Sequence, residues 1–285
     1  MEFYYINSNG ERLDLSEYPY KFQSGNLLDW NFAYNTESGA TKDYTYGFKM
    51  SVKEITCKLA IMCDYSIPIE QRRIEWKEAV NRLADIVQVD IYENKSGKLY
   101  SDSGYYLSCK IVGSEKSNWK MGLPIMFNDI KILVDYPFWV KEEKKKFYPQ
   151  TEVKYENGLD FNYDYAYDYT SQKKGTATWY VDNIRDSDFE MIVYGTCVNP
   201  RIIINGHAYE VFDALESNEY LVINSQKNTV IKYLANGTTK NLFDLRGKQQ
   251  SVFETIPKGN LNLSWSGDFG FDITLFLERS EPKWN

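Results

Sequence analysis

Hydrophobic and polar residues alternate along most of this chain, and that period predicts many short β-strands. Clear examples are residues 188–195, 201–204, 218–224, 261–266 and 271–278, which are rich in Val, Ile, Leu, Phe and Tyr. Side chains two apart in a strand point to the same face, so each strand can bury one of its faces. The pattern predicts a mainly β protein made of two β-sandwich-type domains.

Asn-Gly pairs mark the predicted hairpin turns. Asn9-Gly10 follows extended residues 2–6, and Asn205-Gly206 and Asn236-Gly237 each lie between two β-like runs. A two-residue type I′ turn needs positive φ at both central positions, which Asn and Gly tolerate. Such turns, with strands about every ten residues, predict a jelly-roll or galectin-like sandwich for the second half.

One segment, at about 67–87, has a helical period instead. Ser66 is placed to cap it, and Pro68 lies in the first turn, where its missing N–H costs little. Its apolar residues form one stripe at three-, four- and seven-residue spacing, namely Ile69, Trp76, Val80, Leu83 and Val87. We expect this stripe to pack on a sheet of the first domain, and the following residues 89–92 to be extended.

Two further segments shape the domain organisation. Residues 45–64 form a long extended stretch, in which Phe48, Met50 and Val52 alternate with polar residues and predict a strand with one apolar face. Residues 141–146 read Lys-Glu-Glu-Lys-Lys-Lys, a charge run typical of a solvated linker. We place the boundary there, with domains at 1–146 and 147–285.

Composition narrows the choice of partners. The 285 residues suit two domains, and the net charge of −7 makes nucleic acids and anionic membranes poor partners, because both need a Lys/Arg footprint. The 24 tyrosines suit pleated strands and contact surfaces. No signal peptide or membrane-spanning run is visible, so we expect synthesis in a reducing cytosol and four buried free thiols, at Cys57, Cys63, Cys109 and Cys197.

Residues for catalysis are hard to find. The one histidine, His207, follows a predicted hairpin turn, where an exposed or capping role is usual. Asp160, Asp164 and Asp168 are four residues apart, which in an extended segment separates neighbours by about 13 Å, too far for a retaining acid pair. Their spacing also lacks a calcium-loop pattern. We therefore predict no catalytic, cofactor-binding or metal-binding residue, and no cofactor.

Sugar binding is a weaker possibility, because sugar rings stack on exposed aromatic planes. Trp119, Trp179 and Trp265 are the candidate platforms. Tryptophan in a sandwich is more often buried than exposed, so the signal is not specific.

Several segments resemble the distal tail proteins of siphophages. They are Gly97–Tyr100, Tyr105–Cys109, Asp135–Trp139, Leu159–Tyr169, Phe189–Gly195, Val198–Tyr209, Glu219–Ser225, Asn241–Phe243 and Phe253–Gly259. Their order and spacing match over nearly the whole chain. The resemblance implies an N-terminal ring-forming domain with one helix and a belt-like β-extension, and a galectin-like C-terminal sandwich. It carries no catalytic residues.

The resemblance also implies a function, which we weigh against two others. The leading hypothesis is a structural tail-tip hub made in the host bacterial cytoplasm: a homohexameric ring, or a dimer of hexamers, between the tail tube protein and a tail-associated fibre or lysin protein and receptor-binding protein. The alternative is an adhesin that recognises host cell-wall sugars through the C-terminal sandwich. A wall-degrading hydrolase is the third. The sequence leaves open whether the particle is a phage or a phage-tail-like bacteriocin.

Overall fold

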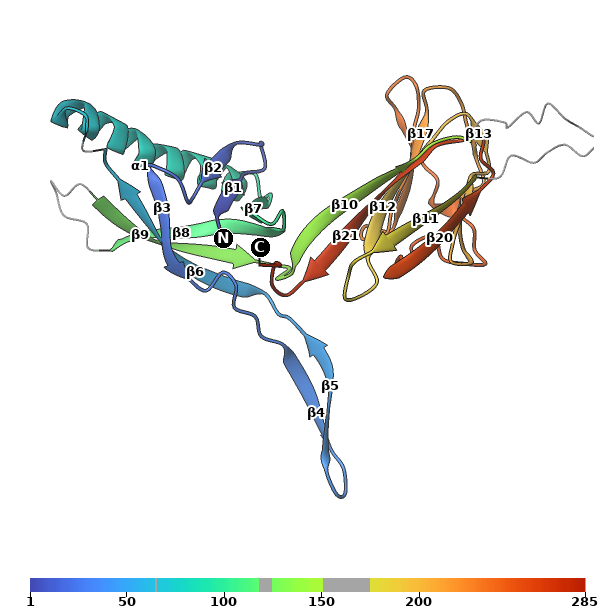
Figure 1. Ribbon diagram of the computed structural model, residues 1–285, viewed down its shortest axis with the longest axis horizontal. Helices are drawn as coiled ribbons and strands as arrows, with labels where there is room; N and C mark the ends of the chain where they lie inside the picture. Colours follow the sequence, from blue (N-terminus) through green and yellow to red (C-terminus); the bar gives the residue numbers. More distant parts are fainter. Residues whose placement is uncertain (65, 118–124, 151–174, 285) are drawn as a thin grey trace, which may run out of the picture. The chain divides into compact units, whose positions relative to one another are not determined.

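The chain folds into two compact units. The computed structural model describes residues 1–64, 66–117, 125–150 and 175–284. Unit 1 contains Met1–Lys141 and Arg279–Asn285, and unit 2 contains Glu142–Glu278. The chain enters unit 2 within strand β10 (Trp139–Phe147) and returns within strand β21 (Phe271–Arg279) (Figure 1).

Unit 1 combines antiparallel strands with one helix, α1 (Ile69–Tyr92) (Figure 1). Its strands outside the hairpin described below are β1 (Phe3–Ile6), β2 (Arg12–Asp14), β3 (Tyr20–Gly25), β6 (Lys53–Met62), β7 (Gly97–Ser101), β8 (Tyr106–Ser117) and β9 (Ile125–Val134). The long strand β8 joins two runs, β2-β1-β7-β8 and β8-β9-β6-β3. Helix α1 packs against β2, β6 and β8 and buries Leu83 and Val87 among the strands' aliphatic side chains.

Helix α1 starts later and ends later than the sequence predicted. The Ser66 hydroxyl does not cap it, because it donates to the Asp64 carboxylate at 2.6 Å, and Pro68 is the N-cap residue. The stripe is also shorter at its start than predicted, since the Ile69 side chain is exposed, whereas Leu83 and Val87 are buried.

The extended structure expected at 89–92 was wrong, because these residues form the last turn of α1. Tertiary contacts hold that turn. The fully buried Asp90 carboxylate accepts a hydrogen bond from the Ser8 backbone N–H at 2.7 Å and another from the Tyr5 hydroxyl. Burial, reinforced by the bond to Asp90, raises the pKa of Tyr5 far above its ordinary value, so the phenol stays protonated and keeps donating.

Unit 2 is a two-layer β-sandwich. One sheet has the order β19-β18-β17-β12-β21-β10 and the other the order β11-β20-β14-β15. The strands not yet given are β11 (Gly175–Val181), β12 (Asp188–Tyr194), β14 (Arg201–Ile204), β15 (His207–Glu210), β17 (Tyr220–Asn224), β18 (Thr229–Tyr233), β19 (Thr239–Asn241) and β20 (Gly259–Trp265), with a small pair β13 (Cys197–Val198) and β16 (Ala214–Leu215) and the 3-10 turn η1 (Phe243–Leu245).

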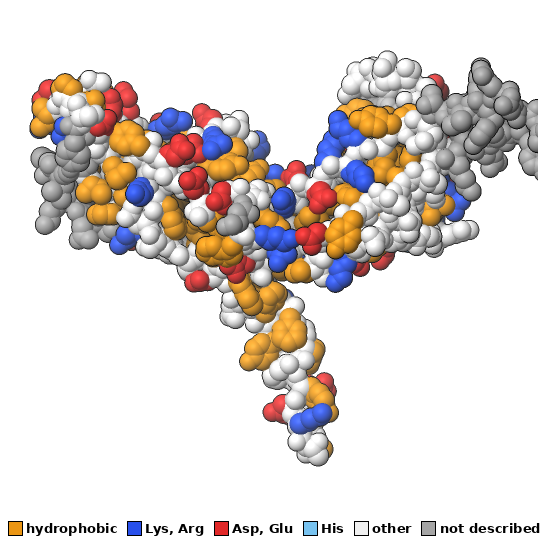
Figure 2. All heavy atoms as spheres, viewed as in Figure 1, with side chains coloured by type: hydrophobic (Ala, Val, Ile, Leu, Met, Phe, Trp, Pro, Cys, Tyr) orange, Lys and Arg blue, Asp and Glu red, His pale blue; other side chains and the backbone are white. Residues whose placement is uncertain are grey.

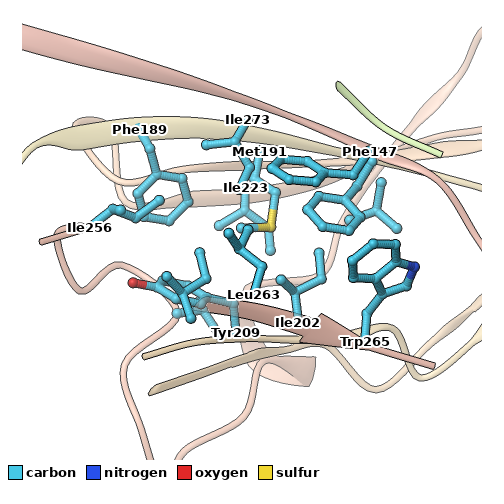
Figure 3. Close-up of a cluster of buried hydrophobic side chains, with 14 of the residues drawn as sticks. Phe147, Phe189, Met191, Ile202, Tyr209, Ile223, Ile256, Leu263, Trp265 and Ile273 are labelled. Atoms are coloured by element: carbon cyan, nitrogen blue, oxygen red, sulfur yellow. The ribbon is translucent and has the colours of Figure 1, made fainter. Parts of the chain in front are cut away.

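The core of unit 2 lies between its two sheets (Figure 3). The Phe147 and Phe271 rings stack with centroids 4.6 Å apart, and Trp265 meets Phe271 edge to face at 5.1 Å. Phe189 and Met191 are fully buried beside them. Each large apolar side chain buried here contributes about 1.5–3 kcal/mol, so the sandwich supplies its own hydrophobic stabilisation.

Of the turns predicted from Asn-Gly pairs, the one at Asn205-Gly206 is confirmed in detail. It joins β14 to β15, and both residues have positive φ, 48° and 88°. At Asn236-Gly237 only the glycine has positive φ, and the loop between β18 and β19 is longer than two residues. There the Asn236 side chain accepts hydrogen bonds from the Thr238 backbone N–H and hydroxyl, and the Asn236 backbone does not adopt the left-handed conformation.

The charge run at 141–146 is not the linker that we expected, because it forms most of β10. Two of its charged side chains show partners within unit 2. Glu143 accepts a hydrogen bond from the Trp179 indole at 3.1 Å, and Lys144 pairs with a carboxylate oxygen of Asp272 at 2.9 Å. A charged side chain is tolerated in a strand when it forms a hydrogen bond or an ion pair of this kind.

The prediction of a mainly β chain with one helix and a β-extension is confirmed, whereas the galectin-like character of the second domain and the boundary at 146/147 stay predictions. None of the described helices is long and apolar enough to span a membrane.

Candidate assembly surface

Unit 1 contains a hairpin that takes no part in its hydrophobic core. The hairpin is formed by β4 (Ala33–Ser38) and β5 (Asp43–Lys49), and we call it the arm. Among the described strands these two pair only with each other, and the arm extends away from the body of unit 1 (Figure 1). Every residue of both strands is exposed. The arm is therefore held by backbone hydrogen bonds and receives no core packing.

The local sequence explains why the arm forms a hairpin but no core. Residues 33–49 contain aromatic residues and threonine, which favour strands, but no Leu, Ile, Val or Met. Gly47 lies at a bulge with φ of 65°, and a Cβ there would come within 2.7 Å of the Asn35 side-chain nitrogen. A residue other than glycine would therefore disturb the pairing of Asn35 with Tyr46.

Aromatic side chains occupy both faces of the arm. Tyr44 and Tyr46 lie on one face, opposite Glu37 and Asn35 of the paired strand. Tyr34 and Phe48 share the other face, with ring centroids 6.1 Å apart. All four side chains are more than half exposed, from 51% for Tyr46 to 63% for Phe48. An exposed aromatic group of this size is a mark of a contact surface.

The aromatic surface continues at the base of the arm, where Figure 2 shows further apolar side chains. Trp30 contacts Phe32 edge to face at 5.8 Å, and Phe32 lies 6.5 Å from Phe138. The Trp30 indole donates to Glu281 at 3.3 Å but remains half exposed, as does Tyr136. Arm and base together form one apolar surface on unit 1, which we call the arm surface.

The sequence did not predict this surface correctly. The alternation in 45–64 indicated one long extended stretch with an apolar face, but β5 ends at Lys49 and β6 begins at Lys53. The Phe48 and Val52 side chains are both exposed. A usable signal was present in the missing aliphatic residues of 33–49, because a strand that lines a core normally carries Val, Ile or Leu.

The candidate sugar platforms are not on a surface. Trp179 and Trp265 are buried and pack on Phe147, at centroid distances of 6.3 and 6.1 Å. Both point inward from β11 and β20, the burial that is more usual for tryptophan in a sandwich, so neither is available as a sugar platform. Trp119 and the aspartates Asp160, Asp164 and Asp168 lie outside the described residues.

The histidine and two of the buried cysteines, the other residue types considered for catalysis or metal binding, are held in contacts within the fold. A ring nitrogen of His207, Nε2, lies 2.8 Å from the Ser251 carbonyl oxygen, and its ring packs on Tyr209. Burial raises the pKa of the Cys57 and Cys109 thiols to about 12, so both stay protonated and unreactive. In the described part of the chain, no three His, Cys, Asp or Glu side chains are grouped in a way that could hold a metal ion.

Comparison with known proteins finds this architecture among solved structures. No protein-family model matches the sequence, and no curated protein does. Among solved structures, a chain of the phage p2 baseplate in its activated conformation with calcium matches with a TM-score of 0.56 and 15% identity, over 98% of each chain. The strontium form of that baseplate gives the same score and identity.

The Dit protein of phage SPP1, described as a paradigm of the hub adsorption apparatus in phages that infect Gram-positive bacteria, matches with a TM-score of 0.59 and 9% identity, over 96% of this chain and 98% of that chain. At these identities the matches concern the fold, and they cover 96–98% of this chain. The chain has the fold of phage baseplate hub proteins.

Proposed function

We propose that this protein is a structural, non-enzymatic subunit of a phage-type tail tip, in which six copies close into a ring. The ring is the hub between the tail tube and the tail-associated fibre or lysin protein with its receptor-binding protein. The observation that carries the proposal is the arm surface, an exposed aromatic surface in a chain whose fold matches baseplate hub proteins.

A closed ring requires two different patches on each copy, because every copy contacts one neighbour with each. The arm surface supplies one of them. Its strands have free edges that can add to a neighbour's sheet, and its aromatic side chains gain burial only in such a contact. A stable contact buries more than about 1,000 Å² in total, an area that an arm of two strands and its base can provide.

A non-enzymatic role fits the surroundings of the reactive residue types. His207 is engaged by a backbone carbonyl, and the Cys57 and Cys109 thiols are protonated at neutral pH. The acidic balance of the chain, with a net charge of −7, also gives no basic footprint for nucleic acid.

Size-exclusion chromatography with light scattering tests this proposal. The full chain should elute as a hexamer or a dimer of hexamers, and a variant with residues 33–49 replaced by a short Gly-Ser turn should elute as a folded monomer. A wild-type chain that stays monomeric at high concentration contradicts the proposal.

A second candidate function is recognition of cell-wall sugars, favoured by the outer face of the sheet β11-β20-β14-β15. Neutral polar side chains alternate there, with Thr176 and Thr178 on β11 facing Ser264 and Asn262 on β20, and the exposed Tyr180 lies opposite Asn260. The threonines, Ser264, Asn260 and Asn262 line a shallow hollow whose described lining is uncharged, which suits a neutral hydroxylated ligand, whereas Tyr180 lies outside that lining. Binding of purified wall polysaccharide that is lost in Asn262→Ala with Tyr180→Ala would support this function, and an unchanged affinity would remove it.

A further inference from the structure

Unit 1 contains a hollow of about 370 Å³ between the second half of α1 and the strands β8 and β9. Most of its lining is apolar, with Leu83 and Val87 from the helix and Ile111, Met126 and Ile130 from the strands. A dry cavity of about 150 Å³ already holds a benzene ring, so this hollow has room for an aromatic side chain. We call it the α1–β9 pocket.

The α1–β9 pocket contains one polar side chain with unmet hydrogen bonds. Asn128 lies in the middle of β9, which pairs with β6 and β8 on its two sides. The residue is fully buried, and neither its Oδ1 nor its Nδ2 has a hydrogen-bond partner among the described residues. Its inward neighbours on the same face of β9 are Met126 and Ile130. Both side chains are apolar, so neither can form a hydrogen bond with the Asn128 amide.

The rim of the α1–β9 pocket is exposed and apolar. Tyr92 is 83% exposed, and Ile91 and Val112 are exposed beside it. The pairing of β8 with β9 shifts register between Ile111 and Gly113, which places Val112 at an irregularity of the strand. A pocket with an apolar rim and a buried amide is suited to a side chain that is both aromatic and hydrogen-bonding.

We propose that the α1–β9 pocket receives a tyrosine from the arm of a second copy, either Tyr44 or Tyr46. This inference rests on the proposed self-association and names where the arm binds. Both tyrosines lie on one face of the arm, are about half exposed and have no core of their own. A phenol hydroxyl donates and accepts, so it matches the Oδ1 acceptor and Nδ2 donor of Asn128, which Phe48 cannot do.

The pocket and the arm are also complementary in the way that a ring requires. They are different patches of the same unit, so binding of one copy's arm in the next copy's pocket is a head-to-tail contact. The arm carries two acidic and two basic residues in 33–49 and is therefore neutral overall, which suits a pocket whose lining is mostly apolar and includes one charged residue, Lys116. The order of contacts would then be arm to pocket around the ring.

Site-directed cross-linking tests the contact directly. In a Cys63→Ser background, copies with Glu37→Cys on the Tyr44 face of the arm are mixed with copies with Val112→Cys at the pocket rim, and treated with a short bismaleimide. We expect dimers that contain one copy of each kind. The matched control replaces Val112→Cys by Val198→Cys, a site on unit 2 that is more exposed than Val112, and should give no such dimers.

A double-mutant cycle tests the hydrogen bond. Tyr44→Phe or Tyr46→Phe, whichever residue enters the pocket, should weaken self-association about fivefold, the usual effect of one net hydrogen bond. Asn128→Leu should weaken it by a similar factor, and the double variant should lose no more than either single variant. Tyr34→Phe, on the opposite face of the arm, is the control and should leave association unchanged.

The outcomes separate this inference from the proposed function. A ring that forms normally in all these variants, with no cross-link between Glu37→Cys and Val112→Cys, overturns the pocket assignment and leaves the hub proposal standing. A wild-type chain that never associates overturns both. The cross-link and the tyrosine variants change exposed residues and the partly exposed Cys63, so they decide the question even if Asn128→Leu does not fold.

Discussion

The sandwich of unit 2 and the arm of unit 1 are both antiparallel β-structure, yet they differ in what stabilises them. In the sandwich, Phe189, Phe271 and Ile273 are fully buried between two sheets. In the arm every residue is exposed, although the strands are paired and bulged as regularly as elsewhere. An isolated two-stranded hairpin is at best marginally stable in water. The difference indicates that the sandwich supplies its own core, whereas the arm has no internal core to stabilise it.

The largest expected effect is a difference in unfolding free energy between substitutions of Phe271 in the sandwich and Phe48 in the arm. Phe271→Ala should lower the free energy of unfolding by about 3–5 kcal/mol, because it removes a ring that contacts Phe147 and Trp265 in the core. Phe48→Ala should change that of the monomer by less than about 0.5 kcal/mol. Urea unfolding of both variants at a concentration where the chain is monomeric measures this, and a similar loss in both would contradict the comparison.

The second prediction concerns the body of unit 1 without its arm, and tests whether internal contacts stabilise it as they stabilise the sandwich. Asp90→Ala leaves the Tyr5 hydroxyl and the Ser8 backbone N–H without their acceptor and should cost about 1–3 kcal/mol of unfolding free energy. Asp85→Ala, an exposed change on the same helix, is the control and should stay within about 0.5 kcal/mol. Thermal unfolding of both variants gives the answer, and equal midpoints would mean that the Asp90 contacts contribute nothing.

A third effect concerns association instead of folding. Changing Tyr34 and Phe48 together to Ala should raise the dissociation constant of self-association at least tenfold, because clustered aromatic residues carry most of the binding energy in an interface. Thr45→Ala on the same arm should have little effect. Sedimentation velocity over a concentration series distinguishes the two variants, and an unchanged constant in the double variant would remove the Tyr34–Phe48 face of the arm from the interface.

The smallest effect is chemical. Cys57 and Cys109 are buried with pKa values raised to about 12. Cys63 is partly exposed, so the expectation that all four thiols are buried was wrong for this residue, and its partial burial also raises its pKa. At pH 8 iodoacetamide should therefore label Cys63 first and reach the two buried thiols only on unfolding. Peptide mass mapping over time follows the order, and early labelling of Cys109 would show that unit 1 opens more readily than its core suggests.

Much of the fold was predictable because local chemistry determines it. Asn205-Gly206 makes its turn through backbone preferences that two residues carry by themselves. The prediction was wrong where distant contacts decide: the last turn of α1 depends on Asp90 meeting Tyr5 and Ser8, and the charge run at 141–146 becomes a strand because Trp179 and Asp272 provide partners. No pattern within a short window contains those partners.

The candidate site was less predictable than the fold, for a related reason. Alternation shows that a strand has two different faces, but it does not show whether the apolar face meets the chain's own core or another molecule. Phe48 and Phe271 both lie in alternating segments, and only the three-dimensional arrangement shows that the first is exposed and the second buried. The resemblance to distal tail proteins supplied the expectation of an extension, and the structure identifies its residues.

Electron microscopy of the purified full-length chain tests the central claim most directly. Six copies of the 33.4 kDa chain, about 200 kDa in total, should appear as closed rings with sixfold symmetry, and the rings should disappear when residues 33–49 are replaced. Isolated single particles of the wild-type chain, or rings that persist unchanged without the arm, would contradict the account.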